Sequence, residues 1–300
     1  MKVLCIGNAT YDITMILDKY PVENIKYNTN EMVMCPGGPS SNAAYLLGKW
    51  GIDTSFAGSV GNDYFGSCIL DDFRKVNVDV SNVFISDRYK STTSLIITSL
   101  ENNSRTIVSY RNPLLKIEKG KMLDDFDYIL VDGREIDYAT EVLKNKGKAI
   151  CVMDASRTDS LNIELAKRVD YLVCSLDFAE KVSDMKLDIS DRNSLLSFYE
   201  FLEKIFKNKI VITLEDDGCL YKDKGIVKIM PALNIHDVKD TTGAGDVFHG
   251  AFLYGLIRGY DYEDVIRLAT IASGLSVRVY GGRKGIPELE EVMMIYEKSR

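Results

Sequence analysis

An aspartate that directly follows a glycine-rich turn is the clearest chemical signal in the sequence. Asp246 comes after Gly243-Ala244-Gly245, and apolar residues recur at helical spacing from Val247 onward. A helix that begins here leaves several backbone N–H groups without intrahelical acceptors, and small residues let an anion approach them closely. The helix dipole adds positive potential at the same end. The stretch therefore predicts a phosphate-binding site with a carboxylate beside it.

Two interpretations of this carboxylate are open. Beside a bound phosphate, Asp246 is suited to act as a general base on an incoming nucleophile. Alternatively, the glycines form an ordinary tight turn and Asp246 complements a helix N-terminus, where aspartate is common for electrostatic reasons alone. The sequence around the turn is needed to distinguish the two interpretations.

The composition is that of a globular protein with an acidic balance. The chain has 300 residues, 46% of them hydrophobic and 27% charged, with a net charge of −7. Without clusters of Lys and Arg, a nucleic-acid partner is not expected. The six cysteines form no CxxC pair, and no apolar run reaches the roughly 18 residues of a membrane helix. We expect a cytoplasmic protein without a membrane partner.

Other enzyme classes lack their motifs. His236 and His249 are the only histidines, and neither has the Ser or Cys context of a nucleophilic triad. Two histidines also make a zinc site unexpected. The sequence contains no GxxxxGK[ST] motif and no GxGxxG motif after a strand, so a P-loop enzyme or a nicotinamide dehydrogenase is not supported.

Strand and helix patterns alternate along most of the chain. This alternation predicts an α/β fold with a mostly parallel central sheet covered by helices on both faces, and ligands at the carboxyl ends of the strands. Asp12 follows the first strand, and Asp132, Arg134, Asp154 and Ser175 follow later ones. The predicted strands cover residues 2–7, 54–60, 128–131, 149–153, 171–174 and 210–214, and two of the predicted helices cover residues 64–76 and 262–279.

Two further segments predict a small sheet. Residues 10–35 are polar and strand-like, while residues 91–100 and 104–110 alternate by two and flank the turn Glu101-Asn102-Asn103. We expect residues 10–35 and about 88–112 to form a lid over the active site.

A second glycine-rich loop opens onto a helix. Pro36-Gly37-Gly38-Pro39 precedes Ser40-Ser41-Asn42 and an apolar helical run, with Ser40 or Ser41 as the predicted N-cap. A plain turn and cap would explain the glycines. It would leave unexplained why Asn42 stands on the first turn, facing the mouth of the loop.

These motifs together resemble a known family. The string DTTGAGDVFHGAF at 240–252 resembles the C-terminal signature of the ribokinase/PfkB carbohydrate kinases, and the stretch from Gly37 to GSVGNDYFG at 58–66 resembles their N-terminal signature. The resemblance covers the chain as a single domain, 1–300. It implies a ribokinase-like three-layer fold, ATP-dependent phosphorylation of a sugar hydroxyl with Mg²⁺, and a homodimer formed through the lid.

The resemblance also implies a role for individual residues. Asp246 is the expected general base, and the amides of Gly243, Ala244 and Gly245 the expected anion hole. The expected sugar contacts are Asp12, Gly38, Asn42, Arg105 and Arg134. The expected ATP contacts are Ser175, Thr213, Gly218 and Thr270. Asp240 and Gly285 lie where many family members hold a monovalent cation such as K⁺.

Departures from the family pattern affect the metal and the substrate. Where many members carry Asn-Glu-x-Glu, this chain reads SLDFAE at 175–180, so its Mg²⁺ ligands are not predicted. This segment, SRTIV at 104–108 and DGR at 132–134 are similar to ketohexokinases, and Pro39 replaces a lysine of ribokinase. A ketose such as fructose, or an acidic sugar gripped by Arg134, is therefore favoured over ribose. A nucleoside kinase and a non-catalytic sugar or nucleotide sensor are the alternatives.

Overall fold

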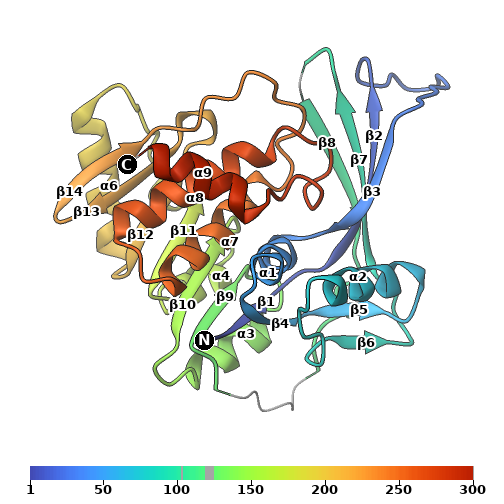
Figure 1. The fold of residues 1–300 in the computed structure, drawn as a ribbon, viewed down its shortest axis with the longest axis horizontal. Coiled ribbons are helices and arrows are strands. Elements are labelled where there is room, and N and C mark those ends of the chain that lie inside the picture. The colour runs from blue at the N-terminus through green and yellow to red at the C-terminus, as the bar shows by residue number, and fades with distance from the viewer. Residues whose placement is uncertain (103, 119–124, 300) are drawn as a thin grey trace.

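The structure is organised around an eight-stranded, mostly parallel sheet. The computed structural model describes residues 1–300 except 103, 119–124 and 300 (Figure 1). Six of its strands, β4, β1, β9, β10, β11 and β12, pair in parallel, and β13 and β14 extend the sheet antiparallel. The order is β14 (Ile226–Met230), β13 (Cys219–Asp223), β12 (Lys209–Thr213), β11 (Tyr171–Ser175), β10 (Ile150–Ala155), β9 (Tyr128–Val131), β1 (Lys2–Ile6) and β4 (Asp53–Ala57).

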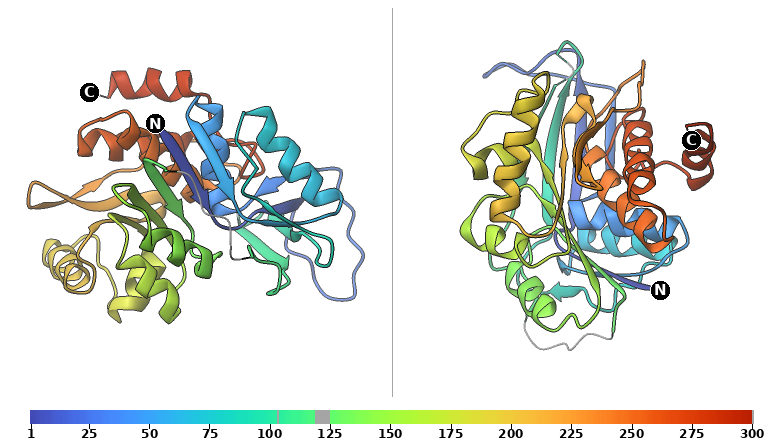
Figure 2. Two further views of the ribbon diagram at one scale, coloured as in Figure 1. Left: turned by 90° about the horizontal axis from the view of Figure 1, so that it is seen from below. Right: turned by 90° about the vertical axis from the view of Figure 1, so that its left-hand side faces the viewer.

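Helices cover both faces of this sheet, and each face has its own core (Figure 2). Val152 of β10 lies in one core, whereas its neighbours Cys151 and Met153 lie in the other. Strands buried on both sides read as continuous apolar runs, which is why these segments were recognisable. The helices are α1 (Pro39–Lys49), α2 (Tyr64–Lys75), α3 (Ile136–Lys144), α4 (Ser160–Ala166), α5 (Leu176–Ser183), α6 (Arg192–Ile205), the short 3-10 helix η1 (Glu215–Asp217), α7 (Ala244–Ile257), α8 (Tyr262–Ser276) and α9 (Leu289–Lys298).

Helix α7 is the most deeply buried helix near the site. Ten of its residues, from Val247 to Ile257, are buried, so it is apolar on all sides. It packs between α1 and α8. At Gly250 a Cβ would lie 3.2 Å from Ala43 Cα of α1, so this glycine lets the two helices approach closely. The N-terminus of α7 is thereby held rigidly beside that of α1.

The small sheet forms from the segments expected to make a lid. Its order is β3 (Met32–Gly37), β2 (Thr10–Leu17), β7 (Thr92–Ser99) and β8 (Ser104–Tyr110), and it stands away from the main body (Figure 1). The hairpin β7–β8 is antiparallel, but β2 and β7 pair in parallel. The predicted turn between β7 and β8 includes residue 103, which lies outside the described residues.

Three local predictions were wrong. Neither Ser40 nor Ser41 caps α1, because Gly38 at φ 102° is the N-cap and Pro39 takes the first helical position, which its fixed φ suits. The strand predicted over 54–60 divides at Gly58 into β4 and β5 (Ser59–Gly61), which pairs with β6 (Phe84–Ser86). Helix α8 ends at Ser276 rather than 279, because the Val277 carbonyl instead accepts from the amides of residues 239 and 240.

None of the helices in the described part of the chain is long and apolar enough to cross a membrane.

Candidate active site

Asp246 lies in the first turn of α7, beside Asn42 in the first turn of α1. The Asn42 side-chain amide donates to Asp246 Oδ2 at 2.6 Å. Within the described residues, Asp246 Oδ1 forms no hydrogen bond. Burial raises the pKa of Asp246, while the hydrogen bond from Asn42 and the proximity of His249 oppose that rise. The carboxylate is thus held by one oxygen and has the other available.

The backbone beside Asp246 is largely open. Gly243 is the N-cap of α7 at φ 79°, where a Cβ would lie only 2.8 Å from Gly282 Cα. The amide of Ala244 donates to the Thr241 carbonyl at 3.3 Å, but the amides of Gly243 and Gly245 have no acceptor within the described residues. A Cβ on Gly245 would meet nothing within 4 Å. Two of the three predicted anion-hole amides are therefore free within the described residues, and one of them, that of Gly245, belongs to a residue with open space beside it.

Asp12 on β2 lies close enough to Asp246 for the two carboxylates to influence each other. Burial raises the pKa of Asp12 to about 6, and the charge of Asp246 adds to the rise. Its Oδ1 is buried without a hydrogen-bond partner. Its Oδ2 lies over the second glycine-rich loop, where a Cβ on Gly37 would be 2.0 Å away. A buried carboxylate oxygen without a donor is suited to accept from a ligand hydroxyl.

Two further carboxylates, Asp132 and Asp154, stand at the ends of neighbouring strands, and Asp154 lies beside His249 of α7. Asp132, after β9, accepts from the amides of Asn8, Ser40 and Arg134. Asp154 Oδ2 at the end of β10 lies 3.3 Å from His249 Nδ1, and burial raises the pKa of Asp154 to about 7. His249 Nδ1 also lies 2.6 Å from the Gly245 carbonyl. The charge of Asp132 raises the pKa of Asp246, and the charge of Asp246 raises the pKa of Asp154. The carboxyl ends of β9 and β10 therefore lie close to the start of α7.

The two predicted arginine contacts have different surroundings. Arg105 on β8 donates to Thr241 Oγ1, so it connects the small sheet to the segment just before Gly243. Arg134 is half-buried, and its guanidinium makes no hydrogen bond or ion pair within the described part of the chain. Burial and the positive charges of Arg111 and Arg157 lower the pKa of Arg134. The carboxylates of Asp132 and Asp159 lie near enough to oppose this fall in the pKa, but neither forms an ion pair with Arg134 within the described residues.

The predicted nucleotide contacts fall into two groups. Ser175 and Thr213 are paired neighbours at the ends of β11 and β12, where Ser175 caps α5 and Thr213 donates to the Cys174 carbonyl. Gly218 makes the turn before β13 at φ 95°. Thr270 differs, because its buried hydroxyl donates within α8 to the Ile266 carbonyl. The Thr270 hydroxyl proton is thus used within α8, and contact of Thr270 with a nucleotide stays a prediction.

The predicted cation residues have structural partners. Asp240 is buried, and its two oxygens accept from the amides of Thr242 and Gly281. The amide of Gly285 donates to the carbonyl of Gly281. Thr242 Oγ1 is buried and has no hydrogen-bond partner within the described residues, which suits a bound cation. Asp240 thereby holds the loop after α8 against the start of α7.

The segment expected to influence Mg²⁺ does not form a metal site. Asp177 pairs with Lys181 at 2.7 Å, and Glu180 pairs with Lys186. No group of three or more metal-ligating side chains occurs in the described ranges. This segment does not fit a protein-only magnesium site.

Sequence reasoning missed Arg283, which lies in the loop before α9. Its Nε donates to Asn42 Oδ1 at 2.8 Å, and its side chain is only 3% exposed. The segment 281–285 looked like an ordinary turn, and a lone arginine in such a turn gives no signal of burial. His249 was likewise set aside, because no sequence pattern joins it to Asp154.

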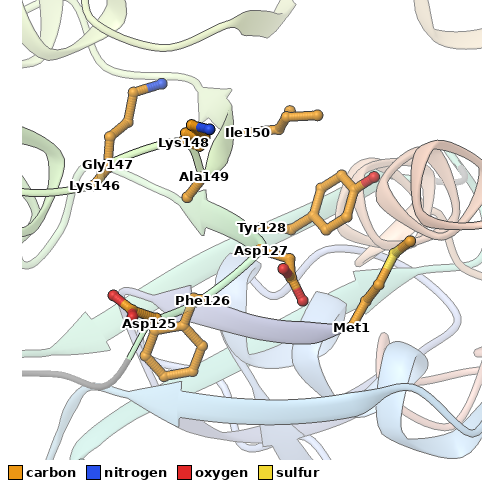
Figure 3. A pocket seen from close by; sticks show the side chains of 10 residues that line it. All are labelled: Met1, Asp125, Phe126, Asp127, Tyr128, Lys146, Gly147, Lys148, Ala149 and Ile150. Atoms are coloured by element: carbon orange, nitrogen blue, oxygen red, sulfur yellow. The ribbon is translucent and has the colours of Figure 1, made fainter.

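A hollow at the edge of the main sheet lies at the opposite strand ends. About 450 Å³ in volume, it is lined by Met1, Asp127 and Tyr128, with Lys146 and Ile150 (Figure 3). These residues stand at the amino ends of β1, β9 and β10, whereas Asp132 and Asp154 stand at the carboxyl ends. The hollow is therefore separate from the site around Asp246.

The fold and the site together define a class of protein. A parallel sheet with helices on both faces, a small sheet, and a carboxylate beside open amides at a helix N-terminus are the parts that a phosphoryl-transferring enzyme requires.

Comparison with known proteins identifies the family. The model of the pfkB family carbohydrate kinases matches residues 1–289, so the chain belongs to this family. The chain is 27% identical to a ribokinase of Lactococcus lactis over 97% of this chain and 95% of that protein. It is 24% identical to a ketohexokinase of Mus musculus over 93% and 97%. The protein is thus an ATP-dependent kinase of the ribokinase family.

Solved structures confirm the predicted ribokinase-like fold. An Arabidopsis thaliana ribokinase complexed with ribose and ATP superposes with a TM-score of 0.83 at 20% identity, covering 99% of this chain and 98% of that one. A Methanocaldococcus jannaschii nucleoside kinase gives a TM-score of 0.81 at 18% identity, covering 99% and 98%. At these identities the likeness concerns the fold alone, and the acceptor is a separate question.

Proposed function

We propose that this protein transfers the γ-phosphoryl group of ATP to a hydroxyl of a small sugar, with Asp246 as the general base. The observation that carries the proposal is the state of its carboxylate. Asn42 holds Oδ2 at 2.6 Å, while Oδ1 is without a hydrogen bond in the described chain, and the amides of Gly243 and Gly245 just before Asp246 are free there too. A base needs one free oxygen and a fixed orientation.

The proposed reaction balances as a single displacement. The sugar oxygen forms a bond to the γ-phosphorus of ATP while the bond from that phosphorus to the β–γ bridging oxygen breaks, which releases ADP. The hydroxyl proton passes to Asp246 Oδ1. The amides of Gly243 and Gly245, at the positive end of α7, stabilise the charge on the phosphoryl oxygens.

We propose ATP and Mg²⁺ as the cofactors. Bound with ATP, the metal would neutralise phosphate charge, and it usually takes most of its ligands from phosphates and water. Because Asp177 and Glu180 are paired with lysines, we derive no step from them. A K⁺ ion at Asp240 and Gly285 stays a prediction, supported by the unpartnered Thr242 Oγ1.

For the acceptor we favour a ketose or an acidic sugar. The proposed contacts are Asp12, whose Oδ1 lacks a donor, together with Gly38 and Asn42. Arg134 supplies a half-buried positive charge that forms no ion pair within the described residues, which suits an electron-rich or anionic substituent. Arg105 donates to Thr241, two residues before Gly243, and we propose that it faces the transferred group.

The lid is proposed to carry the dimer interface. Side chains alternate across a strand, so the sheet face opposite Asp12 carries Ile13, Leu95 and Val108 in one row. Val108 is 61% exposed and Leu95 39%. An exposed apolar sheet face of this kind is suited to association with a second copy. We propose a homodimer on this basis, and separately that the protein is cytoplasmic.

Incubation with ATP, Mg²⁺ and a panel of ketoses, aldoses, sugar acids, sugar phosphates and nucleosides tests the proposal. We expect sugar-dependent ADP formation. Turnover with nucleosides alone would favour a nucleoside kinase, and binding without turnover would favour a sensor.

Asp246→Asn is the matching variant. It keeps the shape of the side chain and loses the base, so we expect kcat to fall by about 10² to 10⁴ while nucleotide binding persists. Near-normal sugar-dependent ATP consumption by Asp246→Asn would refute the role of Asp246.

A further inference from the structure

We infer that Arg283 is a positioning residue that fixes the Asn42 amide and, through it, the catalytic carboxylate of Asp246. This inference rests on the proposed function, because it assigns a task within the same site. Arg283 stands in the loop before α9, and Asn42 stands 241 residues earlier in the chain, on α1.

The direction of each hydrogen bond determines how the amide is turned. A guanidinium can only donate, so Arg283 Nε, at 2.8 Å, requires the oxygen of the Asn42 amide. The amide nitrogen must then point the other way, where it donates to Asp246 Oδ2 at 2.6 Å. With Arg283 absent, the amide could rotate by half a turn and present its oxygen to the carboxylate, which would repel it.

The guanidinium is itself held from several sides. Nη2 donates to Ser41 Oγ at 2.5 Å, and Nη1 pairs with Asp72 Oδ2 of α2 at 3.1 Å. The Tyr45 and Phe73 rings lie 4.6 and 5.2 Å from the guanidinium carbon, within cation–π range. Each of the three guanidinium nitrogens therefore donates one hydrogen bond to a neighbouring side chain. The loop before α9 therefore connects α1 and α2 to the base.

Two roles of Arg283 can be told apart. As a buried ion pair that only stabilises the fold, Arg283 would act mainly through Asp72. As a positioning residue, it acts through Asn42. The Asp72→Asn variant removes the ion pair and keeps the hydrogen bonds to Asn42 and Ser41, so it separates the two.

The experiment compares purified full-length variants with the best acceptor from the panel. For Arg283→Ala we expect a native circular-dichroism spectrum, a kcat lowered by about 10²-fold because the base is misplaced, and a KM for ATP within about twofold of wild type. Guanidinium ion at millimolar concentration should restore part of kcat in a saturable way. Asp72→Asn should lower the melting temperature and leave kcat within about threefold. Arg278→Ala, in the segment after α8, is the matched control, because Arg278 pairs with Glu291 instead.

Non-additivity provides the decisive comparison. In an Asn42→Ala background, Arg283→Ala should lower kcat by less than about threefold further, because both residues act through one hydrogen-bonded chain. A full additional loss in that background, or wild-type kcat in folded Arg283→Ala, would overturn the inference. Should Arg283→Ala not fold, Arg283→Lys keeps the charge without the planar fork and is expected to show the same loss of kcat.

A readout without turnover keeps this inference separate from the proposed function. With ¹⁵N-labelled asparagine, the side-chain NH₂ signal of Asn42 should be shifted and protected from exchange in wild type and Asp72→Asn, and lose both properties in Arg283→Ala. An unchanged signal in Arg283→Ala would contradict the inference. Failure of wild type to turn over any acceptor would instead contradict the kinase proposal.

Discussion

Individual carboxylates in the site are costly to bury, and this cost points to a function. Burial raises the pKa values of Asp12, Asp154 and Asp246, which come from three different elements. Perturbed carboxylates that cluster in this way are typical of catalytic sites, where they are kept for chemistry rather than for stability. Asp12 is the sharpest case, because its Oδ1 is buried without any donor.

Asp12 should make sugar binding depend on pH. Burial raises its pKa to about 6, which the charge of Asp246 supports and the hydroxyls of Ser94 and Thr10 and the charge of Arg283 oppose. Above about pH 6 the ionised carboxylate accepts from sugar hydroxyls with both oxygens, and below it the protonated form does so less well. We expect the KM for the sugar to rise by up to about tenfold per unit as the pH falls below 6, as measured by initial rates.

The control for this dependence is Asp12→Asn. It should have a raised KM at all pH values and lose the change near pH 6, while the KM for ATP stays the same. A wild-type KM for the sugar that is constant across this range would contradict the role of Asp12.

At the scale of elements, the N-terminus of α7 combines two glycines with opposite requirements. Gly243 is needed by the backbone itself, because its φ is 79° and a Cβ would be 2.8 Å from Gly282 Cα. Gly245 has an ordinary helical conformation and open space around it. No neighbour among the described residues requires glycine at position 245. We therefore infer that glycine is used there to leave room for a phosphate.

Alanine at these two positions should give opposite results. Gly245→Ala should keep or raise the melting temperature, because alanine favours helices, yet lower kcat/KM for ATP by about 10²-fold by occupying the phosphate position. Gly243→Ala should lower stability by about 1–2 kcal/mol or more. Thermal melts and ATP kinetics of both variants check this, and Gly245→Ala with normal ATP kinetics would argue against the phosphate cradle.

At the scale of the whole molecule, the small sheet has two unlike faces. The Asp12 face lies toward the site, where Arg105 contacts Thr241. The opposite face packs on the main body at Ile13 but leaves Leu95 and Val108 exposed. A single chain leaves these two side chains uncovered, which motivates the proposed dimer.

A charge on the exposed face should disrupt the dimer. Val108→Glu places a carboxylate at a position that is 61% exposed, so the monomer should fold normally, whereas burial of that charge between two copies should weaken association by about 10²-fold or more. Light scattering should find wild type as a dimer and Val108→Glu as a monomer at the same concentration.

Leu161→Glu on α4 is the matched control, because Leu161 is also an exposed apolar residue, at 59%, but lies on another element. It should remain a dimer. A monomeric wild type, or a dimeric Val108→Glu, would contradict an interface on this face.

Much of the architecture could be predicted because its signals are local. Continuous apolar runs marked the strands buried on both sides, and the Gly243-Ala244-Gly245 turn marked the start of α7. Errors arose where a distant contact decided the local structure. Helix α8 stops where the Val277 carbonyl accepts from the amides of residues 239 and 240. The strand predicted over 54–60 divides at Gly58, where a Cβ would lie 2.6 Å from the Gly7 carbonyl oxygen.

By itself, the sequence determined the class of fold and the position of Asp246 at a helix N-terminus, since periodicity and turn chemistry depend on neighbours in the chain. Only the tertiary structure decided which groups surround that carboxylate. Arg283 reaches Asn42 across 241 residues, and β2 pairs in parallel with β7. The loop that carries Arg283 is placed by its packing on the start of α7, and no pattern within either segment encodes that packing.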